Sequence, residues 1–151
     1  MKKLILLTLV LTSLSFSCRR GQQDTDLIPN VPVGLTVNLD LPAYFDLTLL
    51  GNWMYFPDGY RGLIVYHAFD GEYYAFDRSC SYQPQNTCSQ LWVDSVTLVH
   101  MYCGTYVNGQ YEKCCDSRFE IPMGFPVQGP AINPMKQYAI RKSGNTLFIS
   151  N

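Results

Sequence analysis

The chain has 151 residues, with 11 Lys and Arg against 12 Asp and Glu, so its net charge at neutral pH is −1. This length suits one domain, and the absence of a basic patch or run argues against nucleic acid as a partner. Both histidines fall in expected strands without a nucleophile signature beside them, so no catalytic residue is predicted.

The N-terminus has the pattern of an export signal. Lys2 and Lys3 precede an apolar run at 4–16, which is too short to span a bilayer comfortably. Ser15-Phe16-Ser17-Cys18 resembles a loose lipobox, so residues 1–17 are predicted to be a lipoprotein signal peptide and Cys18 to carry the lipid. The alternative is an ordinary signal peptide cleaved nearby, with Cys18 incidental.

Cleavage at this site leaves 134 residues. These contain nine Lys and Arg and twelve Asp and Glu, so their net charge is −3. Residues 18–33 are polar and then punctuated by proline, which predicts a tether behind the lipid anchor. Residues 34–151 are predicted to form one β domain. We expect a protein of the bacterial cell envelope, held to a membrane through lipidated Cys18 and facing the periplasm or the cell surface.

The domain is expected to consist of short strands. Residues 35–39 alternate apolar and polar side chains, and further strands are expected at 53–56, 62–69, 72–76, 93–102 and 146–149. Asp58-Gly59 and Asp70-Gly71 mark tight turns, because these residues tolerate positive φ. The one helix candidate, at 42–50, is short. This pattern predicts an all-β antiparallel barrel or sandwich.

Asn108-Gly109 predicts a two-residue hairpin turn, which pairs Val107 with Gln110. Counting outward places Cys103 opposite Cys114, at a Cα separation that a disulfide tolerates. In an oxidising compartment a Cys103–Cys114 bridge is therefore the leading pairing, provided that no bulge interrupts the register.

Two motifs carry a family resemblance. Cys-x-Ser-x-Phe at 115–119 and Gly-Pro-Ala-x-x-Pro at 129–134 resemble the second cluster loop of a Rieske iron–sulfur domain, with Cys115 where the family has a ligand histidine. Residues 62–80 resemble the approach to the first cluster loop, and 136–149 resemble the last hairpin. The chain is also similar to Bacteroidetes lipoproteins that carry Rieske-like domains. The resemblance covers about residues 35–151 and implies a small Rieske-like barrel or sandwich with two loop-bearing hairpins.

The resemblance also implies where cluster ligands would stand. A Rieske centre takes Cys-x-His from the first loop and Cys-x-x-His from the second, which correspond here to Cys80, Tyr82, Glu112 and Cys115. A phenol keeps its proton at neutral pH, and a carboxylate suits a sulfur-preferring site poorly. We therefore predict that the cluster is lost and that no cofactor is bound, with 2Fe–2S or zinc as the alternatives.

Some Rieske domains carry an extra cysteine before the loop-two histidine, and this cysteine forms a disulfide to the first loop. That implies a rival pairing of Cys114 with Cys88. With Cys18 lipidated, five cysteines remain, and an odd number leaves one free thiol or several thiolates on a metal.

The sequence thus predicts a lipid-anchored, disulfide-stapled module that does binding or structural work with an unknown protein or small-molecule partner. The alternative is an electron-transfer protein whose 2Fe–2S or other metal centre uses a rearranged set of cysteines and Glu112. A thiol–disulfide oxidoreductase is less favoured, because the chain lacks a Cys-x-x-Cys motif.

Overall fold

The computed structural model describes residues 28–151, so the predicted signal peptide, Cys18 and most of the predicted tether lie outside the described residues. The described chain forms strands joined by turns, with one short 3-10 helix. The elements are β1 (Gly34–Asn38), η3 (Pro42–Thr48), β2 (Trp53–Phe56), β3 (Leu63–His67), β4 (Tyr73–Asp77), β5 (Gln90–Val93), β6 (His100–Val107), β7 (Gln110–Glu120), β8 (Pro126–Gln128), β9 (Gln137–Ser143) and β10 (Thr146–Ser150). Over residues 28–151 no helix is both long and apolar enough to cross a membrane.

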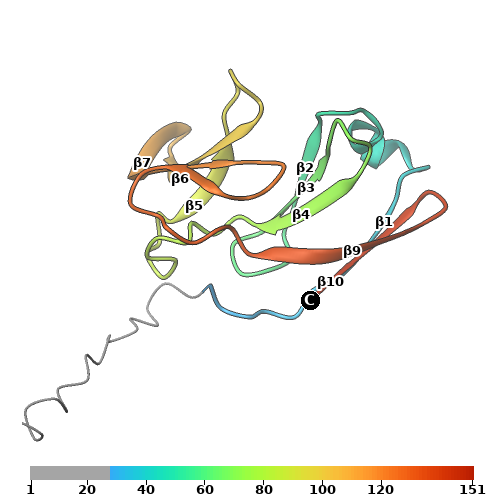
Figure 1. The fold of residues 1–151 in the computed structure, drawn as a ribbon, viewed down its shortest axis with the longest axis horizontal. Coiled ribbons are helices and arrows are strands. Elements are labelled where there is room, and N and C mark those ends of the chain that lie inside the picture. Colours follow the sequence, from blue (N-terminus) through green and yellow to red (C-terminus); the bar gives the residue numbers. More distant parts are fainter. Residues whose placement is uncertain (1–27) are drawn as a thin grey trace, which may run out of the picture.

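The strands make two antiparallel sheets. The larger has six strands in the order β1-β10-β9-β4-β3-β2, and the smaller has four in the order β5-β6-β7-β8. In Figure 1 the four-stranded sheet lies at one end of the molecule and the six-stranded sheet curls at the other. The prediction of an all-β antiparallel fold is confirmed.

Strand β3 explains how the two sheets share one interior. All five of its residues are buried, and successive side chains of a strand point to opposite faces. Leu63 and Val65 therefore pack into a core enclosed by the curled larger sheet, with Leu147 from β10. Ile64 and Tyr66 pack into a second core, which joins the two sheets. A strand buried on both faces reads as the continuous apolar run seen here.

The second core receives side chains from both sheets, and it also contains sulfur. Its buried members outside β3 are Ala68, Phe76, Cys80, Leu91, Met101, Cys103, Phe119, Ile121, Ala131 and Met135. Cys114 and Cys115 are partly buried against the same core. The cysteines therefore meet where the two sheets face each other.

One predicted strand is wrong. Residues 93–102 were expected to be continuous, but the structure has a turn between Val93, where β5 ends, and His100, where β6 begins. The Asp94 carboxylate accepts hydrogen bonds from Val96 N at 3.0 Å and Thr97 Oγ1 at 2.8 Å, and these local bonds replace the strand ladder. The β5–β6 pair is consequently a hairpin rather than one long strand.

The helix candidate at 42–50 is a 3-10 helix over Pro42–Thr48.

Near the N-terminal end of the described chain, the Lys136 ammonium donates to Pro29 O at 3.2 Å and to Asn30 Oδ1 at 2.9 Å. The Asn151 amide donates to Val31 O at 3.1 Å. Residues 29–31 therefore contact the domain directly.

Candidate functional site: a sulfur cluster between two loops

The first loop follows β4 and contains Cys80. Arg61 braces it from outside, because its guanidinium donates hydrogen bonds to Pro84 O at 3.0 and 3.1 Å and to Thr87 O at 3.1 Å. At the base of the loop, Cys80 N donates to Ser89 O at 3.1 Å. A guanidinium is suited to this task, since it presents several donors in a fixed plane. The loop is held closed at its base and along its backbone.

Asp77 fixes the point where this loop leaves the larger sheet. Its buried carboxylate accepts hydrogen bonds from Tyr60 N at 2.7 Å, from Ser79 Oγ at 2.5 Å and from the Tyr138 hydroxyl at 3.0 Å. A buried carboxylate requires such partners, because an unpaired charge in the interior is very unfavourable. Asp77 thus positions the backbone three residues before Cys80.

The second loop is a bulge inside the β6–β7 hairpin. Near the turn the register is the predicted one, with Val107 opposite Gln110 and Gly104 opposite Lys113. Beyond that point Tyr102 lies opposite Arg118, so β7 has three more residues than β6 in this stretch. The extra residues bend β7 and carry Cys114 out of line with Cys103. The predicted Cys103–Cys114 bridge is therefore wrong, because its condition of an uninterrupted register fails at that position.

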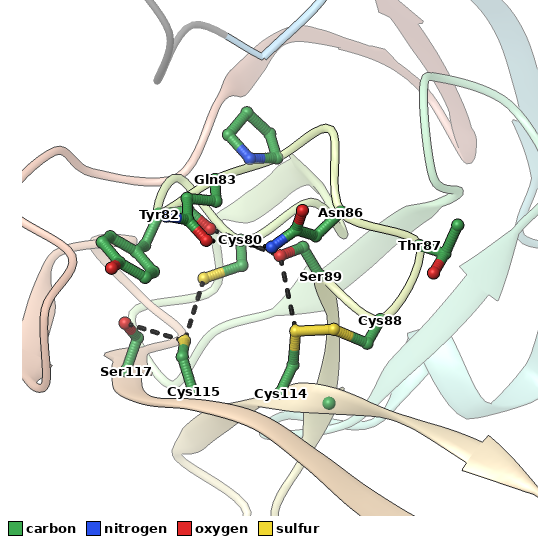
Figure 2. Close-up of a disulfide and its surroundings, with 12 residues drawn as sticks. Cys80, Tyr82, Gln83, Asn86, Thr87, Cys88, Ser89, Cys114, Cys115 and Ser117 are labelled. Atoms are coloured by element: carbon green, nitrogen blue, oxygen red, sulfur yellow. Dashed lines mark hydrogen bonds between the residues drawn. A yellow bond between two sulfur atoms is a disulfide. The ribbon is translucent and has the colours of Figure 1, made fainter.

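Cys114 instead forms a disulfide with Cys88, with a Cα–Cα distance of 5.4 Å. Figure 2 shows this bond between the first loop and the β7 bulge, with Ser89 beside it. The Ser89 hydroxyl lies 3.7 Å from Cys114 Sγ. This pairing, which the family resemblance implied, ties the two loops together.

The segment at 129–134 holds both loops from a third side. Ala131 N donates to Ser117 Oγ at 3.1 Å, and Ser81 Oγ donates to Asn133 O at 2.6 Å. Gly129 has φ +94°, and an added Cβ would lie 2.3 Å from the backbone of Asp116. Only glycine permits so close an approach of two backbones at a positive φ. The Gly-Pro-Ala-x-x-Pro segment therefore packs against the site.

Three thiols converge inside this frame: Cys80 from the first loop, Cys103 from β6 and Cys115 from the β7 bulge. Their sulfur atoms all lie within 4.8 Å of one another, and Cys80 Sγ is 3.8 Å from Cys115 Sγ. Cys80 and Cys103 are 0% exposed, whereas Cys115 is half-buried. Figure 2 shows Cys80 and Cys115 pointing toward each other, with Ser117 beside Cys115. The leading prediction places Cys103 in a disulfide, and only the alternative of a rearranged metal centre counts it among the possible ligands.

The thiols shift one another's pKa values. A hydrogen bond from the Cys103 thiol lowers the pKa of Cys80 to about 7, in spite of the burial of Cys80. The same hydrogen bond, followed by burial, raises the pKa of Cys103. Burial also raises the pKa of the neighbouring Tyr111 to about 12, with a further contribution from Cys103. The arrangement favours one thiolate at Cys80, stabilised by a donor at Cys103.

The ligand positions implied by the resemblance do not all meet. Cys80 and Cys115 come together, with their sulfur atoms 3.8 Å apart, and the Tyr82 backbone N–H helps to lower the pKa of Cys80. Tyr82 is half-buried against the same core. Glu112 is exposed on the β6–β7 hairpin opposite Thr105 and is not a member of the sulfur group.

This geometry does not fit a 2Fe–2S cluster held at the four implied positions. In that assignment Cys80 would bind one iron and Cys115 the other. Ligands of different irons lie on opposite sides of the cluster, but these two sulfurs are only 3.8 Å apart. Two irons and their bridging sulfides have no room between them.

Comparisons with known proteins give similarity of shape at low sequence identity. No family model matches the chain, and no curated protein does. One similar structure is the ferredoxin of carbazole 1,9a-dioxygenase from Nocardioides aromaticivorans IC177, at 17% identity and a TM-score of 0.44, over 80% of this chain and 97% of that one. Another is a complex of reduced oxygenase and oxidised ferredoxin in carbazole 1,9a-dioxygenase, at 14% identity and a TM-score of 0.46, over 81% of this chain and 94% of that one. Similarity at this level assigns neither an activity nor a cofactor to this chain.

Proposed function

We propose that this protein is an extracytoplasmic lipoprotein, anchored through Cys18, whose Rieske-like domain holds no 2Fe–2S cluster and works as a disulfide-stapled binding or structural module. The Cys88–Cys114 disulfide supports a stapled module, because it joins the two loops. The observation that supports the absence of a cluster is the 3.8 Å separation of the Cys80 and Cys115 sulfurs. Disulfides persist in oxidising compartments, in agreement with the export signal at residues 1–17.

The loop pair is built to stay rigid. The disulfide, the Arg61 brace and the 129–134 segment restrain it from three directions. Such bracing lowers the entropy lost on binding, because the loops are already ordered before a partner arrives. This favours a module that presents a fixed surface over an enzyme with a mobile active-site loop.

Metal analysis and a visible spectrum test the loss of the cluster. The protein is produced with its leader in a bacterial host and purified from the envelope fraction. We expect a colourless preparation without stoichiometric iron, because the sulfur geometry leaves no space for two irons. A brown protein with two irons per chain would refute the proposal and favour the electron-transfer alternative.

Membrane anchoring is tested by Cys18→Ser, with Cys115→Ser as a matched cysteine substitution inside the β domain. We expect Cys18→Ser to abolish labelling by a radioactive fatty acid and to move the protein out of the membrane fraction. Cys115→Ser should leave both unchanged. Lipid labelling that persists in Cys18→Ser would show that the anchor is elsewhere.

The second candidate, a metal-containing electron-transfer protein, is motivated by one observation: the convergence of Cys80, Cys103 and Cys115. Iron content separates it from the first candidate. The three thiols can also bind a metal ion other than iron.

A further inference from the structure

The three free thiols form a compact donor set that neither the disulfide nor the resemblance accounts for. Cys103 stands outside the four implied ligand positions, yet its sulfur lies within 4.8 Å of those of Cys80 and Cys115. The three residues come from the first loop, strand β6 and the β7 bulge, so only the folded domain brings them together. Such convergence of the best soft-metal ligands, two of them fully buried, points to a metal ion.

We propose that Cys80, Cys103 and Cys115 bind one Cu(I) ion in a three-coordinate thiolate site. This deepens the proposed function by naming what the module binds, and it depends on the domain being free of an iron–sulfur cluster. The site differs from a Rieske centre in its nuclearity, in its ligands and in the role of Cys103.

The distances support a single ion. A metal–sulfur bond of about 2.3 Å places two sulfurs on one metal about 3.8 to 4.0 Å apart, in tetrahedral or trigonal geometry. The observed Cys80–Cys115 separation is 3.8 Å, and closing the whole group from at most 4.8 Å needs only small side-chain movements. The site is therefore nearly formed before the ion arrives.

The identity of the ion follows from the number of donors. Among the described residues, the group contains three cysteine sulfurs and no histidine nitrogen or carboxylate oxygen. Zinc takes a fourth ligand, from the protein in structural sites and from water or substrate in catalytic ones, so three thiolates alone leave its coordination incomplete. Soft thiolates suit Cu(I), zinc and iron–sulfur clusters, and of these Cu(I) is the one whose coordination three thiolates complete. The Ser117 hydroxyl, at 3.2 Å from Cys115 Sγ, is occupied as the acceptor for Ala131 N.

The surroundings provide an entrance and compensating charge. Cys115 borders a surface groove of about 380 Å³ together with Tyr111, Lys113 and Arg118. An ion can therefore reach Cys115 first and then pass to the two buried thiols. Lys113 is ion-paired with Asp116 in this groove, whereas the Arg118 Nε is buried without a hydrogen-bond partner. The Arg118 guanidinium is therefore the cation of the groove that can offset the negative charge of three thiolates on a monovalent ion.

The test is a competitive Cu(I) titration of the full chain against a chromogenic Cu(I) chelator, without oxygen. Ascorbate keeps the copper reduced and leaves the Cys88–Cys114 disulfide intact. We expect one Cu(I) per chain, and X-ray absorption at the copper edge should find three sulfur neighbours at one distance. Loss of an outer-shell partner already costs 10–100-fold in affinity, so Cys103→Ser and Cys115→Ser should each weaken binding by at least about 100-fold.

Glu112→Gln is the matched control, because it removes an implied Rieske ligand position that lies outside the sulfur group. Its Cu(I) affinity should equal that of the unmodified chain. Cys115 is half-buried, so Cys115→Ser remains informative if Cys103→Ser unfolds, and urea unfolding of each variant checks this.

Cu(I) binding that survives Cys115→Ser would overturn the inference, as would a stoichiometry other than one. So would tight four-coordinate zinc that Cu(I) does not displace. In a colourless, iron-free and lipid-anchored preparation these results refute the copper site alone. Two irons per chain would refute the proposed function itself.

Discussion

The two sheets of this protein differ in how regularly they are built. In the six-stranded sheet the ladders run without interruption, as between β9 and β10, where five consecutive pairs keep one register. In the four-stranded sheet the register shifts in both the β6–β7 and the β7–β8 pairs. The described cysteines all belong to the smaller sheet, its bulge or the loop that leads into it. The regular sheet supplies the scaffold, and the irregular one supplies the chemistry.

The junction between the sheets should be the most sensitive point. Asp77→Ala removes the acceptor for three buried or half-buried donors, so we expect the free energy of unfolding to fall by about 4 kcal/mol. Urea unfolding measures this loss. The exposed Asp46→Ala is the control, with an expected change within about 0.5 kcal/mol. Similar values for the two variants would mean that Asp77 does not anchor the loop.

Removing the disulfide tests whether the smaller sheet depends on its cross-link. For a sequence separation of 26, loop-closure entropy predicts that Cys88→Ser combined with Cys114→Ser lowers the free energy of unfolding by about 3.5 kcal/mol. Reduction of the unmodified protein should produce the same loss. The half-buried Cys115→Ser should cost less than about 1 kcal/mol. A reductant without effect on unfolding would contradict the disulfide.

A pair of glycines compares the two regions directly. Gly129 and Gly71 both have positive φ, +94° and +84°, but only at Gly129 would a Cβ meet neighbouring backbone, at 2.3 Å. We expect Gly71→Ala to cost about 1 kcal/mol from the left-handed backbone alone. Gly129→Ala should cost about 3 kcal/mol, because crowding against the β7 bulge adds to that strain. Equal losses would show that the 129–134 segment does not press on the bulge.

The smallest effect is expected at the Arg61 brace. Arg61→Lys keeps the charge but loses the planar fork that binds Pro84 and Thr87, so we expect about 1 kcal/mol of local destabilisation. Faster hydrogen exchange at 83–88 would report it. Arg141→Lys, on the exposed side of β9, should leave exchange at 83–88 unchanged. If the two variants exchange alike, the first loop is held without Arg61.

The sequence predicts the regular parts of this fold well, for local reasons. Asn108 and Gly109 have φ of +51° and +80°, as the hairpin turn requires, and the register beside them is the predicted one. The alternation of apolar and polar residues in β1 matches a strand with one face turned to the core, and the apolar run of β3 matches a strand buried on both faces. The turn at Asp94 was missed, although its Asp-Ser-Val-Thr sequence carries a turn signal.

The bulge could not be predicted from local sequence, because contacts from distant segments fix it. Gly129 presses on Asp116, Ser117 accepts a hydrogen bond from Ala131, and Cys114 is bonded to Cys88. A turn fixes register only near itself, and the shift begins beyond Gly104. The same shift frees Cys103 to face Cys80 and Cys115. From the sequence Cys103 is one of several possible ligands, and only the folded structure places its thiol beside those of Cys80 and Cys115.

Cysteine mapping tests the central claim, which is that one disulfide joins the two loops and that Cys80, Cys103 and Cys115 remain free thiols. The protein is denatured with a metal chelator, its free thiols are alkylated without reduction, and its peptides are identified by mass spectrometry. We predict one peptide pair linked through Cys88 and Cys114, with alkylated Cys80, Cys103 and Cys115. A peptide pair linked through Cys103 and Cys114 would contradict the account.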